Sequence, residues 1–267
     1  MKIKGLLLGL AGLFLLVGCG PNQVVHGDKN IITEVIDISD YDEIKLVGAS
    51  MVVNYKQTED APFLEVTTDQ NIYDMYEFII EDTDALIIRP KKEYRRKFNI
   101  RPSEFTVTTN SRGLEDIDIA GNVTFNINEA FNSDKLELEL AGSGSVHLND
   151  TANIKSVDVK IAGSGSLYAS ALFSTKFKSE VAGSGFLQMA GRGEQATFKI
   201  AGSGDFRGYD FILNDMSCSI AGSGEIQTHV NGNMTVEVAG SGNIKYKGEP
   251  TNIIRKIIGS GSVQKVD

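Results

Sequence analysis

The sequence predicts an all-β protein: a right-handed β-helix, or β-solenoid, with about 20 residues per coil and Ala-Gly-Ser-Gly at one corner of each coil. Three observations predict it. The four-residue motif recurs through the second half of the chain, and the residues around it are aliphatic at fixed offsets. A content of 28 glycines against 5 prolines and no tryptophan favours strands and tight turns over helices. Each repeat would bury its apolar side chains by stacking on its neighbours.

Residues 1–18 have the features of a lipoprotein signal peptide. Lys2 and Lys4 precede an uncharged apolar stretch, Gly5 to Val17, that is shorter than the roughly 20 residues a spanning helix needs. The following Leu16-Val17-Gly18-Cys19 resembles a bacterial lipobox, in which the cysteine is acylated and becomes the new N-terminus. The alternatives are an ordinary secretory peptide or a transmembrane anchor. We expect a lipid anchor on Cys19, because several acyl chains on one residue hold a protein stably at a membrane.

We expect residues 19–30 to form a linker, and the remainder of the chain to be acidic. Removing residues 1–18 takes away two lysines and moves the formal net charge from −9 to about −11. Nucleic acid is therefore not an expected partner, because binding it takes a basic face. Apart from Cys19, which is expected to be acylated, the chain has only Cys218, so no intramolecular disulfide is expected.

Residues 31–110 predict an irregular N-terminal β region. Short runs of β-branched and aromatic residues alternate with turn residues, and helix-period patterning is absent almost everywhere. The expected strands are Thr33 to Ile38, Ile44 to Val47, Met51 to Tyr55, Phe63 to Thr68, Phe78 to Ile80, Leu86 to Arg89 and Phe105 to Thr109. This region either continues the solenoid with degenerate coils or caps its end, and the sequence leaves both open.

Residues 111–267 predict the regular solenoid. The motif begins at Ala141, Ala162, Ala182, Ala201, Ala221 and Ala239, recurs as Ile-Gly-Ser-Gly at Ile258, and has a shortened form at Ala120. The residue before each motif is aliphatic, as in Leu140, Ile161 and Val181, and we expect these side chains to form one inward column. On the opposite face Glu139 and Lys160 begin an alternation of charge that favours one register.

A second inward column is expected five positions after each motif start, beginning with Val146 and Leu167. Beyond it the coil closes through a variable return, such as Asn149 to Lys155 or Gly191 to Gln195. The glycines permit positive φ at the corner. The serine between them is expected to bond through its hydroxyl, either locally or to the serine one coil away.

These residues carry a resemblance to a known family. Tyr41 to Ala49, Ala85 to Lys91, Phe105 to Thr108, Ile117 to Gly121 and the serial motif resemble the auto-transporter adhesin head GIN domain family over about residues 35 to 265. The resemblance implies a β-helical lipoprotein or secreted protein of the Bacteroidetes envelope, and it supplies no catalytic or binding residues. The chain departs from the pattern at Asn122, where the corner is short, and at Arg255, a charge in an inward column. Both mark expected ends of the regular stack.

Catalysis finds little support in the pattern. Polysaccharide hydrolases and lyases on β-helices need converging carboxylates, and the best pair here is Asp205 with Glu225 on adjacent coils. No histidine or arginine column accompanies them, so we interpret them as a solvated corner. His26, His147 and His229 fall in different columns, which predicts neither a metal site nor a cofactor. Cys218 is expected to be a small core residue.

One basic run breaks the acidic background and forms a single expected loop. It contains Arg89, Lys91, Lys92, Arg95, Arg96, Lys97 and Arg101, with Tyr94 and Phe98 interleaved. Such a run is most often a solvated face. The functional hypothesis is contact with an anionic surface, such as lipopolysaccharide, phospholipid headgroups or an acidic glycan.

The sequence thus favours a non-enzymatic cell-envelope lipoprotein whose rigid solenoid surface serves adhesin-like binding or scaffolding. Its expected partners are the membrane, through the lipid anchor, and a glycan or an envelope protein. The alternatives are a carbohydrate-active enzyme on the same fold and a purely structural periplasmic protein. Gly20-Pro21-Asn22-Gln23 contains no acidic cluster associated with surface export, so an outer-membrane lipoprotein is expected with its side of the membrane left open.

Overall fold

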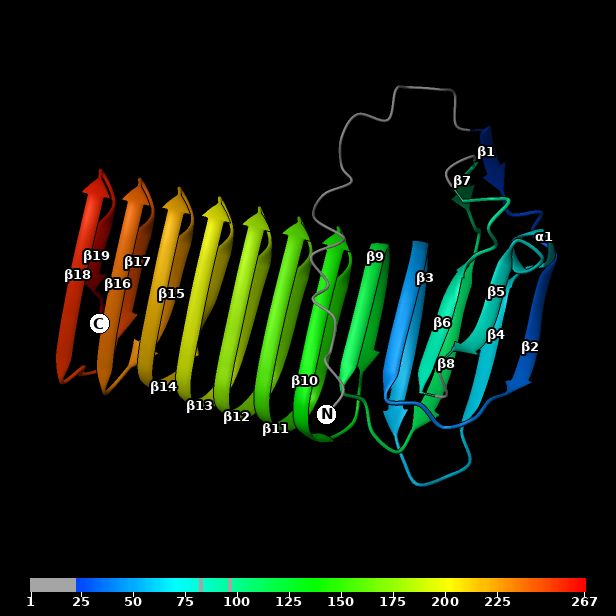
Figure 1. The fold of residues 1–267 in the computed structure, drawn as a ribbon, viewed down its shortest axis with the longest axis horizontal. Coiled ribbons are helices and arrows are strands. Elements are labelled where there is room, and N and C mark those ends of the chain that lie inside the picture. The colour runs from blue at the N-terminus through cyan, green and yellow to red at the C-terminus, as the bar shows by residue number, and fades with distance from the viewer. Residues whose placement is uncertain (1–22, 82–83, 96–97) are drawn as a thin grey trace, which may run out of the picture.

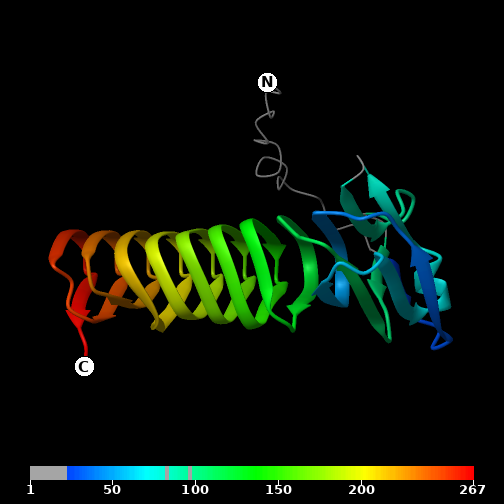
Figure 2. The ribbon, with the colours of Figure 1, turned by 90° about the horizontal axis from the view of Figure 1, so that it is seen from below.

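The computed structural model describes residues 23–81, 84–95 and 98–267. It is built almost wholly of strands, with one short helix, α1 (Gln70–Tyr73). Figure 1 shows the strands side by side along the long axis, and Figure 2 shows the same strands from below as successive coils. The predicted all-β solenoid is confirmed: parallel coils about 20 residues apart stack in about 8 turns.

The regular coils are made of strands that run around most of a turn. These are β9 (Asp116–Ile127), β10 (Phe131–Gly142), β11 (Ser145–Gly163), β12 (Ser166–Gly183), β13 (Phe186–Gly202) and β14 (Asp205–Gly222). The last coils are divided into β15 (Glu225–Val230), β16 (Asn233–Gly240), β17 (Asn243–Lys247), β18 (Asn252–Gly259) and β19 (Ser262–Lys265). Equivalent residues pair in parallel from coil to coil, as in Ile161 with Val181. Every inward position therefore forms a column.

The interior is filled by the predicted aliphatic columns. Leu140, Ile161 and Val181 are buried, and so are Val146 and Leu167 of the second column. The column three residues before the motif contains one aromatic residue, Phe198, whose ring centroid lies 4.3 Å from that of Phe206 in the second column. Burying a side chain of this size contributes roughly 1.5–3 kcal/mol, so the stacked columns hold the coils together.

The corner depends on glycine. Gly163, the first glycine of its Gly-Ser-Gly, has φ 120°, and a Cβ there would lie 2.6 Å from the carbonyl oxygen of Gly142 one coil away. The next residue bridges the coils through its main chain, since the Ser164 N–H donates to that same Gly142 oxygen at 2.8 Å. Contrary to expectation, the corner serines in the described coils join neighbours through the peptide group and not through their hydroxyls.

The N-terminal half both extends the stack and closes it. β3 (Glu43–Gln57) pairs in parallel with β9 on one side, and with β6 (Ala85–Pro90) and β8 (Phe105–Ser111) on the other. The antiparallel strands β2 (Ile31–Asp37), β4 (Phe63–Asp69) and β5 (Tyr76–Glu81) then cover the end. The N-terminal half therefore contains both degenerate coils that continue the solenoid and a β-cap on its end. The parallel stack has no break at the expected boundary between residues 110 and 111.

A separate two-stranded sheet joins β1 (Gln23–His26), inside the expected linker, to β7 (Phe98–Arg101). Residues 1–22, which include Cys19 and the expected signal peptide, lie outside the described residues. The described ranges contain no helix with the length and hydrophobicity needed to cross a bilayer.

The opposite end of the stack is open. β18 and β19 still pair in parallel with the coil before them. No coil follows them in the described chain, so Ile257, whose counterparts are buried elsewhere, is 38% exposed. Arg255 reaches solvent in the same way, which explains how a charge is tolerated in an inward column.

Candidate ligand-binding surface

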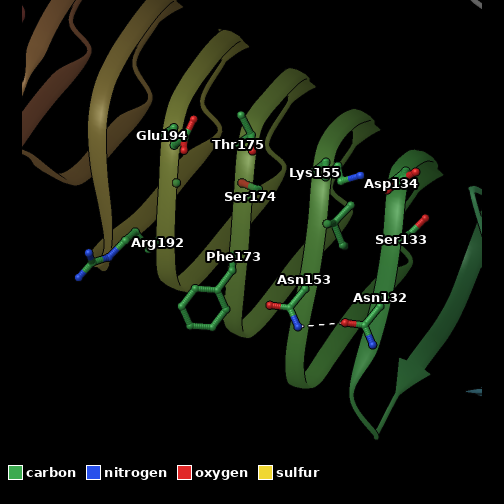
Figure 3. A pocket seen from close by; sticks show the side chains of 12 residues that line it. Asn132, Ser133, Asp134, Asn153, Lys155, Phe173, Ser174, Thr175, Arg192 and Glu194 are labelled. Atoms are coloured by element: carbon green, nitrogen blue, oxygen red, sulfur yellow. Dashed lines mark hydrogen bonds and ion pairs between the residues drawn. The ribbon is translucent and has the colours of Figure 1, made fainter.

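A groove of about 650 Å³ crosses the outside of β10, β11, β12 and β13. It lies on the variable returns, and Figure 3 shows its lining side chains arranged in rows that run from coil to coil. A register shift in the β11–β12 ladder, between Leu148 and Thr151, precedes the groove, and a matching shift in the β12–β13 ladder falls between Ala169 and Leu172. The corner before the groove is thus irregular, whereas the groove itself is in register.

One row of side chains, which we call the outer row, begins with the exposed residues Asn132, Asn153, Phe173 and Arg192, each paired with the next. It continues through Ile212, His229 and Lys247. The outer-row side chains point outward because the residue that follows each of them is on the inward face, as Ile154 and Leu213 are. In Figure 3 the first four stand in line along the groove.

Amide groups fix the first part of the outer row. Asn153 Nδ2 donates to Asn132 Oδ1 at 3.0 Å. The Gln57 side chain in turn holds the Asn132 main chain, accepting from its N–H and donating to its carbonyl oxygen, each at 2.9 Å. The two asparagines therefore present the rest of their amide groups to solvent in a defined orientation.

Phe173 and Arg192 form the other half of this part of the row. Phe173 is 44% exposed, and within the described residues neither its ring nor the Arg192 guanidinium has an aromatic, cation–π or ionic partner. The inward-facing neighbours of these two residues, Ser174 and Gly193, are small and also line the groove. Ser174 Oγ is buried without a hydrogen-bond partner. An apolar ring and a free cation therefore stand beside each other over a partly polar floor.

A second row borders the groove and is nearly neutral. It contains Asp134, Lys155, Thr175 and Glu194. Lys155 Nζ lies 2.6 Å from Asp134 Oδ1, so these two charges cancel locally. Glu194 is in this row, and Figure 3 shows it on the same coil as Arg192 but away from the outer row.

A second hollow, of about 490 Å³, lies on the neighbouring face. Its aromatic rings face one another along the stack: His147 and Tyr168 lie 4.7 Å apart at 10°, and Arg207 stands 5.1 Å from the ring of Phe186. Burial lowers the pKa of His147, so its ring is neutral at pH 7. Neighbouring side chains cover the faces of these rings. The stacked side chains therefore stiffen this side of the solenoid and offer mainly ring edges to a ligand.

Asp205 and Glu225, the carboxylates weighed as a catalytic pair and interpreted as a solvated corner, lie on paired positions and are hydrogen bonded to their own chain. Asp205 Oδ1 accepts from the Glu225 main-chain N–H at 3.0 Å. Glu225 Oε1 accepts from Gln227 at 2.8 Å and from Lys245 at 3.1 Å, and these contacts, the Gln227 hydrogen bond first, lower the pKa of Glu225. An ionised, hydrogen-bonded carboxylate is poorly suited to be a general acid.

The basic run is partly neutralised inside the protein. Arg89 pairs with Glu77 at 2.6 Å and with Glu81 at 2.7 Å. Arg95 also pairs with Glu77 at 2.7 Å, and Lys91 Nζ donates to the Asp74 carbonyl oxygen at 2.7 Å.

Lys92 and Arg101 are exposed, whereas Arg96 and Lys97 lie outside the described residues. Contact of this run with an anionic surface stays a prediction, with fewer free cations than the sequence indicates.

A carboxylate cluster was not found from the sequence, because its members are far apart along the chain. Glu43 of β3 meets Asp116 and Asp118 of β9, with one carboxylate oxygen from each lying within 4.8 Å of the others. Burial, followed by the charge of Asp118, raises the pKa of Asp116 to about 7. Burial and the charge of Glu139 raise the pKa of Asp118 to about 6. These three have the spacing to hold a cation, and Lys45 pairs with Glu43 beside them.

The remaining candidates are simpler. His26, His147 and His229 stand on β1, β11 and β15, as expected from their different columns. Cys218 is confirmed as a core residue, since it is buried between Phe198 and Val236, and burial raises the pKa of its thiol to about 12. A thiol with that pKa is unreactive.

Known proteins share this architecture. A model of the family described as "putative auto-transporter adhesin, head GIN domain" matches residues 40–250. A solved structure of a "putative lipid binding protein" from Parabacteroides distasonis is 32% identical, with a TM-score of 0.83, and the match covers 92% of this chain and 100% of that one.

A "putative adhesin" from Parabacteroides merdae is 28% identical over the same shares, also with a TM-score of 0.83. Another from Parabacteroides distasonis is 29% identical over 91% of this chain and 100% of that one, with a TM-score of 0.80. No curated protein matches the chain.

Proposed function

Because the chain belongs to the auto-transporter adhesin head GIN domain family, we propose that it is a non-enzymatic cell-envelope lipoprotein that binds its ligand through the groove on β10–β13. The observation that carries this is the outer row. Phe173 and Arg192 are exposed, unpaired among the described residues and in register with two fixed asparagines. A ligand that reaches Phe173 and Arg192 therefore has no internal partner of either side chain, within the described part of the protein, to displace.

The solenoid supports a role in presentation. Each coil of the groove is held by neighbours on both sides through parallel ladders, so the groove has a rigid backbone. The interior is filled with side chains, as the buried Phe177, Phe198 and Phe211 illustrate. We therefore assign ligand contact to the outside of the coils.

The site chemistry supports a binding role over the rival carbohydrate-active enzyme. Asp205 and Glu225 are hydrogen bonded within the chain, and the lowered pKa of Glu225 leaves that side chain without a proton to donate at pH 7. We expect no release of reducing ends from anionic polysaccharides. Cleavage that Asp205→Asn and Glu225→Gln abolish would favour the enzyme.

The anchor belongs to the same proposal. Cys19 is four residues before Gln23, where β1 begins, and four extended residues reach about 14 Å. β1 lies at the capped end (Figure 1). Acylation of Cys19 would hold that end at the outer membrane and direct the open coils away from it. Cys19→Ser should abolish incorporation of an alkyne-labelled fatty acid, and undiminished labelling would contradict the anchor.

Capture by the protein lacking the acyl chains tests the binding function. The chain from residue 20 onward, coupled to beads, is offered glycans and envelope fractions alongside the double variant Phe173→Ala/Arg192→Ala. Arg207→Ala is the matched control, because Arg207 lies in the second hollow. We expect the double variant to lose the captured material and the control to keep it. Equal capture by all three proteins would refute a function of the groove.

A further inference from the structure

The outer row contains no carboxylate. From Asn132 to Lys247 its seven positions are filled by Asn, Asn, Phe, Arg, Ile, His and Lys, in a chain whose formal net charge is −9. The acidic residues near the groove, Asp134 and Glu194, are confined to the second row, where Asp134 is neutralised by Lys155. Within the row itself a negative charge therefore meets no like charge, and Glu194, which has no ion-pair partner among the described residues, lies in the second row.

We propose that the ligand of this groove is an extended acidic polysaccharide, with carboxylate-bearing sugars of the uronate type, lying along the solenoid axis on the outer row. The inference rests on the proposed function and specifies the ligand class of the same site. Its basis is the juxtaposition of a free aromatic ring, a free guanidinium and a fixed pair of amides at successive coils.

Spacing favours a polymer along the axis. Neighbouring parallel strands are about 4.8 Å apart, and an extended sugar chain advances by a comparable distance for each sugar. One outer-row side chain can therefore meet one sugar, coil after coil. A folded protein partner would need no such regular row.

The first four positions of the row supply contacts that a uronate chain can use. The Asn132 amide nitrogen and the Asn153 amide oxygen, which their mutual hydrogen bond leaves free, match sugar hydroxyls as donor and acceptor. The exposed face of Phe173 can cover the apolar C–H face of a sugar ring. Arg192 presents the planar fork that binds a carboxylate with two hydrogen bonds.

Charge sets the expected strength and salt response. Arg192 and, farther along, Lys247 are the cations of the row, and Lys247 Nζ lies 5.4 Å from the Tyr209 ring. Two cations on an exposed surface attract an anionic chain over about 10 Å at 0.1 M salt and less at higher salt. Binding should therefore weaken as salt rises, while the stacking and amide contacts remain.

Titration calorimetry with oligogalacturonate tests the proposal, using the chain from residue 20 onward. We expect binding that weakens at least tenfold with Phe173→Ala and with Arg192→Ala, less with Arg192→Lys, and not with Arg207→Ala. Carboxyl-reduced oligogalacturonate of the same length should bind at least tenfold more weakly than the acidic form. Unchanged melting temperatures of the variants show that folding is intact.

Several outcomes would overturn the proposal. One is failure to bind oligogalacturonate, alginate and hyaluronan oligosaccharides alike; another is equal affinity for the acidic and carboxyl-reduced chains. A third is undiminished binding by Phe173→Ala and Arg192→Ala. If the bead assay still shows capture that depends on the groove, the ligand class is wrong while the binding function stands; if that capture is absent too, both fail.

Discussion

The middle coils and the final coil share one sequence pattern but differ in burial. Ile200 and Ile257 occupy the same position before the motif, yet Ile200 is 3% exposed and Ile257 is 38% exposed. Both are on parallel strands, and only Ile200 has a coil on each side. Burial in this protein is therefore a property that each coil receives from its neighbours, and identical residues have different energetic weight along the stack.

Truncating the shared column should expose this difference most clearly. We expect Ile200→Ala to lower the free energy of unfolding by about 2–5 kcal/mol, because it leaves a cavity between two coils. Ile257→Ala should cost under about 1 kcal/mol, because its side chain already meets water. Urea denaturation measures both, and equal losses would mean that the final coil is covered in solution.

Substitution of a corner glycine should cause the second largest loss in the free energy of unfolding. Gly163→Ala places a Cβ 2.6 Å from the Gly142 oxygen at φ 120°, so we expect a loss of about 2–3 kcal/mol from strain and displaced ladders. Gly113→Ala is the matched control, since its Cβ would come no nearer than 4.0 Å to Gln57. Melting curves that fall equally for both variants would contradict a special requirement at the corner.

The carboxylate cluster at the junction of β3 and β9 should make stability depend on pH. The folded state raises the pKa of Asp116 from its ordinary 3.8 to about 7, so it holds a proton that the unfolded chain releases. The free energy of unfolding should therefore fall as pH rises from about 4 to about 7 and then level off. Asp118 acts in the same direction, with a pKa of about 6.

Asp116→Asn should flatten this dependence. At pH 8 the variant should be more stable than the wild type by about 1 kcal/mol, less than the full linkage value because the carboxyl is partly solvated. Melting temperatures at pH 5 and pH 8 check this, with Asp134→Asn as an exposed control. An unchanged pH slope in the Asp116 variant would rule out the assignment.

The smallest loss in the free energy of unfolding is expected from removing an ion pair on the charged outer face of the middle coils. Lys160 Nζ lies 2.5 Å from Glu139 Oε1, and Lys199 pairs with Glu180 at 3.1 Å. Lys160→Ala should cost about 0.2–1 kcal/mol at low salt and less at 1 M salt. Urea denaturation at the two salt concentrations measures this difference, and a larger loss at high salt would be inconsistent with a solvated ion pair.

The columns were predictable because they stand at constant distances from the motif. Leu140 and Val146 could be placed inside from period and alternation alone, as could the pairing of Glu139 with Lys160. The outer row could not, because register shifts at the preceding corner change its distance from the motif. From Ala120 to Asn132 that distance is 12 residues, and from Ala239 to Lys247 it is 8.

Partners across the cap were also hidden from the sequence. The run from Arg89 to Arg101 indicates positive charge, but Glu77 neutralises Arg89 and Arg95 only because β5 folds back antiparallel on β6. The carboxylate cluster depends in the same way on the pairing of β3 with β9. In both cases the sequence shows which residues are charged. The pairing of the strands decides which charged groups lie close enough to interact.

Because the outer row is in register, its length is set by the number of coils. Duplicating one coil inserts one more position into the row and leaves the cross-section of the groove unaltered, since each coil touches only its neighbours. Gain or loss of a whole coil would then lengthen or shorten the row by one position. For a ligand bound along the outer row as proposed, the preferred length would change with the number of coils.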